Sequence, residues 1–375
     1  MDFHPTEEQT DAAGLAARIF GDLATHERLA AAGTGSDAEL WKALTSAGLT
    51  AAVQEIGLLG LVLLLEEQGR TTAQVPYAAT CVYGILPVAA HGSPEQRARL
   101  LPALGTGEAV ATGAFPERGR ITATSAGGLT GTVPIVPWLR DATHVLVPDA
   151  DRALWLVRTD APGVETAAVE TTAPWSAGRL TLTRAEGERI GHSAAYAPAP
   201  DDARYPASDA PRARDAIGHG SRPYEDTLAA ARTAFAGLQA GVCAGSLARA
   251  VQYTSTREQF GRPLSTNQGV MLRAADAYMD TEAIRVTAYE AAWRIDQGLA
   301  ARGHALTAAW WASEAGKRVV HAGQHLHGGM GADLDHPVHR HFLWGRQLDA
   351  YLGCGSELLA ELGASIASTA EGEQA

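Results

Sequence analysis

The sequence predicts a mostly α-helical protein with three structured parts: an N-terminal helical domain over residues 1–108, a small middle β domain over 109–191 and a C-terminal four-helix bundle over 223–375. Apolar residues recur at helical spacing in the first and last parts, whereas they alternate with polar residues in the middle. Residues 192–222 are rich in Ala, Pro, Asp and Arg and have no sustained apolar period, which predicts a loop or linker.

The composition is that of a globular protein. Hydrophobic residues make up 46% of the 375 residues and charged residues 19%, so the chain can bury a large core and does not resemble a disordered protein. The formal net charge of −12 repels phosphate at long range. We therefore expect neither nucleic acid nor an anionic membrane as a general partner.

The expected compartment is the cytoplasm. The three cysteines are widely spaced, and an odd, sparse set fits a reducing environment better than a disulfide scaffold. The N-terminus lacks a basic region followed by an apolar stretch, so no secretion signal is expected. The most apolar segment, Ile56–Leu65, is about half the length that crosses a bilayer and is predicted to be a buried helix.

In the N-terminal domain, local signals mark helices. Trp41 and Leu44, followed by Ala47 to Leu49, give apolar spacings near one helical turn. The run from Ser93 to Gln96 is a helix start, because Ser93 can cap the helix, a proline suits its first position, and Gln96 stands at the reciprocal place of a capping box.

The middle domain shows the two-residue period of strands. The segment His144–Val157 predicts two strands around a polar turn at Asp149–Asp151. Further on, Leu180 and Leu182 alternate with threonines, as in a half-buried strand. We therefore predict a small antiparallel sheet.

The helical period returns after residue 223. The first bundle helix places four apolar residues on one face: Leu228, Phe235, Leu238 and Val242. Met271, Ala274 and Tyr278 share a face of the next helix. The region 304–326 and a last stretch to about Gly363 complete the four predicted helices, enough for an antiparallel bundle.

Two motifs in the bundle suggest chemistry. The first is Thr-Arg-Glu-Gln-Phe-Gly-Arg-Pro-Leu at 256–264, followed by Gln268; the second is His-Leu-His-Gly-Gly-Met-Gly at 325–331. Arg257 offers a planar fork of donors suited to a pyrophosphate, and Phe260 offers an aromatic face. The glycines of the second motif allow close approach of the backbone to a flat or phosphorylated ligand.

Together, in this order and roughly 70 residues apart, the two motifs resemble the C-terminal domain of the acyl-CoA dehydrogenase family, whose order of segments is similar as well. The resemblance implies FAD as the cofactor and an acyl-CoA thioester as the substrate. It also implies that these residues reach across a subunit interface to the adenosine diphosphate half of a neighbour's FAD; the matching positions are Arg257, Gln259, Phe260, Gln268, His325, Gly328 and Gly329. His325 stands where the family has glutamine.

The general base that this chemistry needs is missing. The reaction removes a proton from the carbon beside the thioester, so a carboxylate must lie within hydrogen-bond reach of it. The resemblance puts that base at Leu352 in most members, or at Ala231 in a second group. Asp349 lies a turn before Leu352 and is the nearest stand-in, although a surface charge is the stronger interpretation; Asp226 is a weaker candidate.

The segments that face the flavin in the family are also reduced here. They are Gln54–Leu58, Ala114–Arg120 and Ile135–Trp138, which lack the family's usual glycines or hydroxyls. In both respects the chain resembles the base-lacking subunit of actinobacterial α2β2 acyl-CoA dehydrogenases, including those that act on steroid side-chain thioesters. The resemblance therefore implies a second, glutamate-bearing dehydrogenase subunit as partner.

Other interpretations stay open at this point. One is a homotetrameric acyl-CoA dehydrogenase with a displaced base, and another is a non-enzymatic scaffold that binds CoA or flavin. A metal site is not predicted, because no HExxH pattern or cysteine partner accompanies the histidines of this region. Those histidines are His321, His325, His327, His336, His339 and His341.

Overall fold

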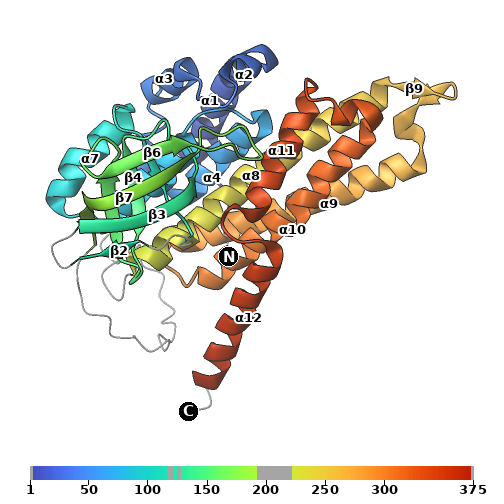
Figure 1. Cartoon of the computed structure of the whole chain (residues 1–375). Coiled ribbons are helices and arrows are strands. Elements are labelled where there is room, and N and C mark those ends of the chain that lie inside the picture. Colours follow the sequence, from blue (N-terminus) through green and yellow to red (C-terminus); the bar gives the residue numbers. More distant parts are fainter. Residues whose placement is uncertain (1–2, 117–120, 125–127, 192–221, 373–375) are drawn as a thin grey trace.

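The computed structural model describes residues 3–116, 121–124, 128–191 and 222–372. Most of the predicted linker therefore lies outside the described residues. The predicted fold class is confirmed: helices at both ends of the chain flank a small β region (Figure 1).

The N-terminal part is helical up to Thr106. Its helices are α1 (Glu7–Leu23), α2 (His26–Ala32), α3 (Ala38–Ser46), α4 (Val53–Thr71), α5 (Tyr77–Thr80), the π-helix η1 (Cys81–Ile85), α6 (Leu86–His91) and α7 (Pro94–Thr106). The predicted capping box is present at α7, where Ser93 and Gln96 each bond the other's backbone N–H. A second capping box, between Thr6 and Gln9, starts α1.

Helix α4 contains the apolar run that the sequence assigned to a buried helix, and most of that run is buried. The helix is broken at Gly57, whose φ of 71° suits glycine best. The N–H groups of Leu58 and Leu59, exposed by this break, donate to the two oxygens of Asp296 at 2.7 and 2.9 Å. A carboxylate from the end of the second bundle helix thus caps a helix of the N-terminal part.

Two four-stranded sheets follow. One has the order β1-β4-β5-β8 and the other β2-β3-β7-β6. Their strands are β1 (Ala111–Gly113), β2 (Thr122–Ala123), β3 (Gly128–Val136), β4 (His144–Pro148), β5 (Leu154–Arg158), β6 (Val164–Ala168), β7 (Gly178–Glu186) and β8 (Glu188–Ile190). The two predicted strands around the polar turn are β4 and β5, which pair antiparallel, while β1 pairs with β4 in parallel.

The C-terminal part is built on long helices. Its elements are α8 (Pro223–Thr256), the hairpin β9 (Glu258–Gln259) and β10 (Arg262–Pro263), the 3-10 helix η2 (Leu264–Thr266), α9 (Gln268–Asp296), α10 (Arg302–Leu326), the 3-10 helix η3 (Gly328–Ala332), α11 (Pro337–Tyr351) and α12 (Gly355–Gly372). Helix α8 runs from beside the β region to the far end of the bundle, where the hairpin lies (Figure 1).

The last stretch of the bundle differs from the prediction. It forms two helices, because the chain turns after α11 at Gly353, whose φ is 119°. The side chain of Glu357 then accepts the N–H of Cys354 at 3.0 Å and helps to start α12. Helix α12 projects away from the rest of the bundle (Figure 1).

Helix α8 is the centre of the fold. It packs closely on α4, because Gly69 and Gly241 allow backbone to meet backbone, and a Cβ on either would clash with a carbonyl of the other helix. Among the described residues, α8 alone is long and apolar enough to cross a membrane, and 72% of that apolar window is buried inside the fold. Burial within the bundle therefore accounts for its apolar character.

Candidate cofactor and active site

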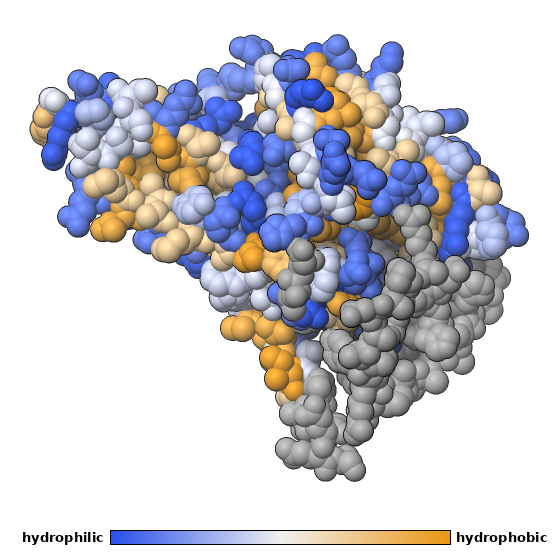
Figure 2. Space-filling view, turned by 180° about the vertical axis from the view of Figure 1, so that it is seen from behind, coloured by the Kyte–Doolittle hydropathy of each residue, from blue (hydrophilic) through white to orange (hydrophobic). Residues whose placement is uncertain are grey.

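All seven residues predicted to contact the cofactor are exposed, and they lie at one end of the bundle. They are contributed by the turn after α8, the β9–β10 hairpin, the start of α9, the end of α10 and η3; they are Arg257, Gln259, Phe260, Gln268, His325, Gly328 and Gly329. Apolar side chains also gather on this projecting part of the molecule (Figure 2). The set therefore faces outward and not toward the chain's own core.

Arg257 follows the last residue of α8 and leads into the hairpin. The carbonyl of Arg257 accepts the N–H of Leu264 at 2.9 Å, which closes the hairpin onto the end of α8. At its tip, Phe260 has a φ of 53° and is 99% exposed. A phenylalanine in the left-handed region is uncommon and costs conformational energy. An exposed ring in a strained position is typical of a side chain that contacts another molecule.

The second motif lies beside the start of α9. Helices α9 and α10 are antiparallel, so Gly269 and Leu272 near the start of α9 line one groove with His321 and Ala322 near the end of α10. His325 stands one turn further along α10. Gly328 has a φ of 62°, and a Cβ there would meet no atom within 4 Å, so the backbone is open to a ligand.

The two positions that the family resemblance gives for a base are both buried in the main hydrophobic core. Ala231 on α8 is fully buried, and Leu352, directly after α11, is 5% exposed. Phe235 lies one turn after Ala231, and Tyr351 directly precedes Leu352. Neither position carries a group that can accept a proton, and neither opens onto solvent.

Aromatic rings fill the space beside these positions. Trp138, which ends a segment that would face the flavin, stacks on Trp175 with ring centroids 4.5 Å apart. Trp175 meets the edge of Tyr351 at 5.8 Å and of Trp344 at 5.6 Å, while Trp138 contacts Phe235 at 6.5 Å. Phe235 and Tyr351 meet each other at 4.9 Å. The three indole rings are fully buried, so van der Waals contacts close this region.

The aromatic cluster extends toward the β region. The hydroxyls of Tyr83 and Tyr351 lie 2.9 Å apart, and burial raises the pKa of both phenols, so they are neutral donors and acceptors and not bases. Phe115, from the shortened segment at 114–120, stacks between Tyr83 and Tyr224. Sequence reasoning missed this cluster, since only the absent hydroxyl before Trp138 hinted at it.

Asp349 is not the surface charge that the sequence suggested. Its side chain is buried, its Oδ1 accepts the hydroxyl of Ser313 at 2.7 Å, and its Oδ2 lies 3.3 Å from Arg346. The spacing placed it correctly on α11 but could not show that α10 covers it. Its carboxylate is engaged within the fold, between α10 and α11.

Asp226 lies in the first turn of α8. Burial, with a smaller contribution from Glu225, raises the pKa of Asp226 to about 6, and His91 lies 3.5 Å from its carboxylate. The carboxylate is about half exposed, so solvent screens these effects. Asp226 is five positions before Ala231, which puts the two side chains on different faces of the helix.

The buried histidines of the second motif region have structural contacts. Nδ1 of His327 lies 2.7 Å from the carbonyl of Gly323, and its ring stacks on Tyr253. His341 bonds the carbonyl of Arg70, and burial lowers its pKa to about 4. Within the part of the chain that the structure describes, no three histidine, cysteine or acidic side chains come together as a metal site.

Comparisons with known proteins agree with this architecture. Family models for the acyl-CoA dehydrogenase N-terminal domain and C-terminal domain match residues 6–108 and 218–366. Acyl-CoA dehydrogenase FadE27 of Mycobacterium tuberculosis is 34% identical over 98% of this chain and 100% of its own length. The solved steroid acyl-CoA dehydrogenase Tcur3481–Tcur3483 superposes with a TM-score of 0.85 at 38% identity, covering 97% of this chain and 99% of the other. The ChsE4–ChsE5 complex of M. tuberculosis superposes with a TM-score of 0.84 at 30% identity, covering 98% of this chain and 99% of the other.

Proposed function

The chain belongs to the acyl-CoA dehydrogenase family, and on that premise we propose that it is the non-catalytic subunit of a FAD-dependent acyl-CoA dehydrogenase built from two different chains. In the complete enzyme, a base removes a proton from the α-carbon of the thioester and a hydride leaves the β-carbon, which creates a double bond. The partner subunit supplies the base and the flavin-facing surface. This chain contributes the exposed residues at the end of its bundle to the site of an FAD that the partner subunit holds.

One observation supports the non-catalytic role above all others. Trp138, at the end of the segment that would face a flavin, stacks on Trp175, and the two rings contact Phe235 and Tyr351, the neighbours of the two proposed base positions. A flavin ring and an acyl chain need an open slot, whereas these fully buried indoles pack at van der Waals distance. The chain has thus lost both the base and the space that the base would serve.

The outward-facing end of the bundle supports the second half of the proposal. FAD, when bound, accepts the hydride, so the protein's task is to hold and orient it. Arg257 has a guanidinium suited to a pyrophosphate, Gln268 and His325 can hydrogen-bond, and the open backbone at Gly328 permits close approach. The donor set fits the adenosine diphosphate half of a dinucleotide, and its exposure fits a cofactor held mainly by another chain.

The relatives support a two-chain enzyme and a substrate class. Two similar solved structures are described as a pair of named chains, and one of them is described as a steroid acyl-CoA dehydrogenase. We therefore assign this chain to an α2β2 assembly that acts on CoA thioesters of steroid side chains. The exposed apolar face around Met271 and Tyr278, which the sequence alone had not distinguished from a core face, supports a large subunit interface.

The proposal is tested by producing the chain alone and together with a glutamate-bearing dehydrogenase subunit. We expect the isolated chain to be colourless and inactive on acyl-CoA substrates, and the co-purified complex to be yellow and active with one FAD per two chains. A positioned base contributes about 10²–10⁴-fold to rate, so its absence is easily measured. A yellow, active homotetramer with one FAD per chain would overturn the proposal in favour of an enzyme with a displaced base.

A further inference from the structure

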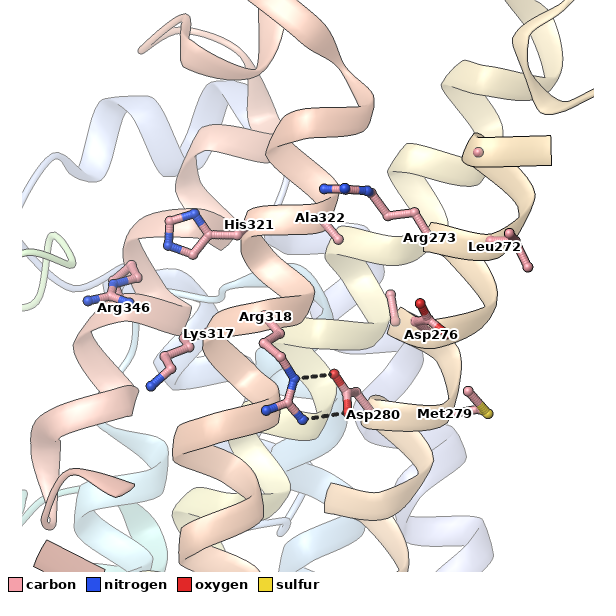
Figure 3. Close-up of a pocket in the computed structure, with 12 residues that line it drawn as sticks. Leu272, Arg273, Asp276, Met279, Asp280, Lys317, Arg318, His321, Ala322 and Arg346 are labelled. Carbon is pink, nitrogen blue, oxygen red and sulfur yellow. Dashed lines mark hydrogen bonds and ion pairs between the residues drawn. The ribbon is translucent and has the colours of Figure 1, made fainter. Parts of the chain in front are cut away.

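A groove of about 950 Å³ runs along the outer face of the bundle between α9 and α10, with one wall completed by α11. Its lining combines apolar and charged side chains, and Figure 3 shows Arg318 and Asp280 meeting between α9 and α10, with Leu272 and Met279 on the outer side of α9. None of these residues belongs to the cofactor set proposed above. The groove begins beside that set, at Gly269, and extends along α9 as far as Asp280.

The α9 rim of the groove carries an apolar stripe. Leu272 and Met279 line the groove and are 57% and 61% exposed, and Val286 follows at the same seven-residue interval. A seven-residue repeat of apolar side chains is the pattern that packs against a second helix. Exposed large apolar residues in a row favour burial by a partner.

The charged side chains of the groove present cations to solvent. Three ion pairs lie along it, and in each the cation is the more exposed member. Arg318 is 49% exposed against 19% for Asp280, and Arg346 is 36% exposed against 11% for Asp349. In the third pair, the side chain of Lys317 is 35% exposed and that of Glu314 is 28% exposed. Arg273 adds a fourth cation for which the described residues offer no carboxylate partner within ion-pair distance, and Asp276 is the one exposed acid among the residues that line the groove.

From this arrangement we propose that the groove binds an acidic amphipathic helix of the partner subunit and that its outer layer of cations disfavours pairing with a second copy of this chain. Guanidinium and ammonium groups that already touch one carboxylate still have free N–H donors, which a partner's carboxylates can satisfy. In a twofold pair of identical chains the same patch meets itself. Arg273, Lys317 and Arg318 would then face cations across the interface.

Apolar burial supplies attraction in either pairing, so the charges decide which pairing forms. Like charges across an interface cost several kcal/mol, whereas complementary charges steer association and fix the choice of partner. A chain with a net charge of −12 that displays cations at this one apolar face is suited to a partner that displays acids there. This inference rests on the proposed two-chain enzyme and names the chemistry of its partner.

The test reverses two groove charges, Arg273→Glu with Lys317→Glu, in the chain co-produced with its glutamate-bearing partner. The matched control is Arg179→Glu with Arg158→Glu on the β region. Like the groove pair, it combines one cation without an ion-pair partner among the described residues and one in an exposed ion pair, here with Asp160. We expect the groove variant to raise the Kd of the complex at least tenfold and to flatten its dependence on salt. The control should leave both unchanged.

Formation of the complex and its FAD content are the two readouts that separate this inference from the proposed function. If a yellow, active complex forms and is equally insensitive to the groove and control variants, the inference is wrong and the two-chain enzyme stands. If the groove variant assembles normally but loses FAD, the groove binds the phosphates of the cofactor, and the inference is again wrong. If no complex forms even with the unaltered chain, the proposed function fails.

In that last case, sedimentation of the isolated chain still tests the second half of the inference, that the cations disfavour pairing of two copies of this chain. The groove variant should self-associate more strongly than the unaltered chain, because its new glutamates can pair with Arg318 and Arg346 of a second copy. A homodimer of the unaltered chain that is stable at low salt and indifferent to these substitutions would contradict it. Circular dichroism melting of both variants checks that neither has lost its fold.

Discussion

At the scale of single residues, the proposed non-catalytic role rests on more than a missing carboxylate. Leu352 and Ala231 stand at the positions that the family resemblance gives for the base, and the rings of Trp138, Trp175 and Tyr351 occupy the neighbouring space. A substitution that places a carboxylate at one of these positions leaves the aromatic rings in the space that a substrate would need. Residue-level tests should therefore separate the loss of the base from the loss of space.

We predict that Leu352→Glu will not create activity and will lower the free energy of unfolding by about 3 kcal/mol or more, because it buries a carboxylate without a partner. Leu352→Met, which conserves volume, should cost less than about 1.5 kcal/mol. Urea denaturation measures both. Turnover by a stable Leu352→Glu protein without its partner would show that a usable cavity exists.

We also predict that Arg257→Ala will weaken FAD binding by the two-chain complex about tenfold or more. The substitution removes a charge-assisted contact worth on the order of 1.5–3 kcal/mol. Arg257→Lys keeps the charge but loses the planar fork, so its loss should be smaller. Fluorescence titration of the apo-complex with FAD gives both values, and unchanged affinity in Arg257→Ala would exclude the contact.

At the scale of elements, contacts between distant helices define the shape of the bundle. The break of α4 at Gly57 is stabilised by Asp296 from the end of α9, which accepts two backbone N–H groups. This joins the N-terminal part to the bundle through a carboxylate for which the described residues offer no basic partner at ion-pair distance. Burial raises the pKa of Asp296 from 3.8 to about 6.

The pH dependence of stability should report this contact. Because the pKa is raised in the folded state, the proton on Asp296 contributes stability that is fully present below pH 3.8 and is lost as the pH rises through about 6. The difference in unfolding free energy between the natural chain and Asp296→Asn should therefore shift against the natural chain, by on the order of 2–3 kcal/mol, between pH 4 and 7. Denaturant unfolding across this range measures it, and a constant difference would contradict the assignment.

At the scale of the whole molecule, the core is well buried, but part of the surface carries exposed apolar side chains. Helices α4 and α8 bury a large core and the β region buries a second one, whereas the far end of the bundle exposes a strained phenylalanine and an apolar helix face. Such a surface is characteristic of a subunit that is covered in its assembly. Stability and cofactor binding should therefore depend on the partner.

We predict that FAD in excess will not raise the melting temperature of the isolated chain but will raise that of the two-chain complex. A ligand stabilises a protein only through binding to its folded form, by about 2.7 kcal/mol at a hundred times its Kd. Thermal melts with and without FAD, on the chain alone and on the complex, provide the four values. A clear FAD-dependent rise for the isolated chain would indicate its own cofactor site.

The sequence by itself determined the fold class and the order of its parts, and it predicted that the base is absent. Helical and strand periods, and the capping box at Ser93, are local signals that follow from backbone geometry, so they could be found without the structure. The spacing of the two motifs likewise predicted Arg257 and Gly328 as ligand-contacting candidates. Counting along the chain from the family's motifs was enough to predict that Leu352 and Ala231 stand where the family has its glutamate.

The tertiary structure alone decided which faces are covered. Periodicity shows that Met271 and Tyr278 share a face, but not that this face lies outside the core, and it cannot show that α10 buries Asp349. The stack of Trp138 on Trp175 joins residues that no local period relates, and both meet helices far along the chain. A side chain's own sequence neighbourhood fixes its direction from the backbone, whereas what lies opposite it depends on how distant elements pack.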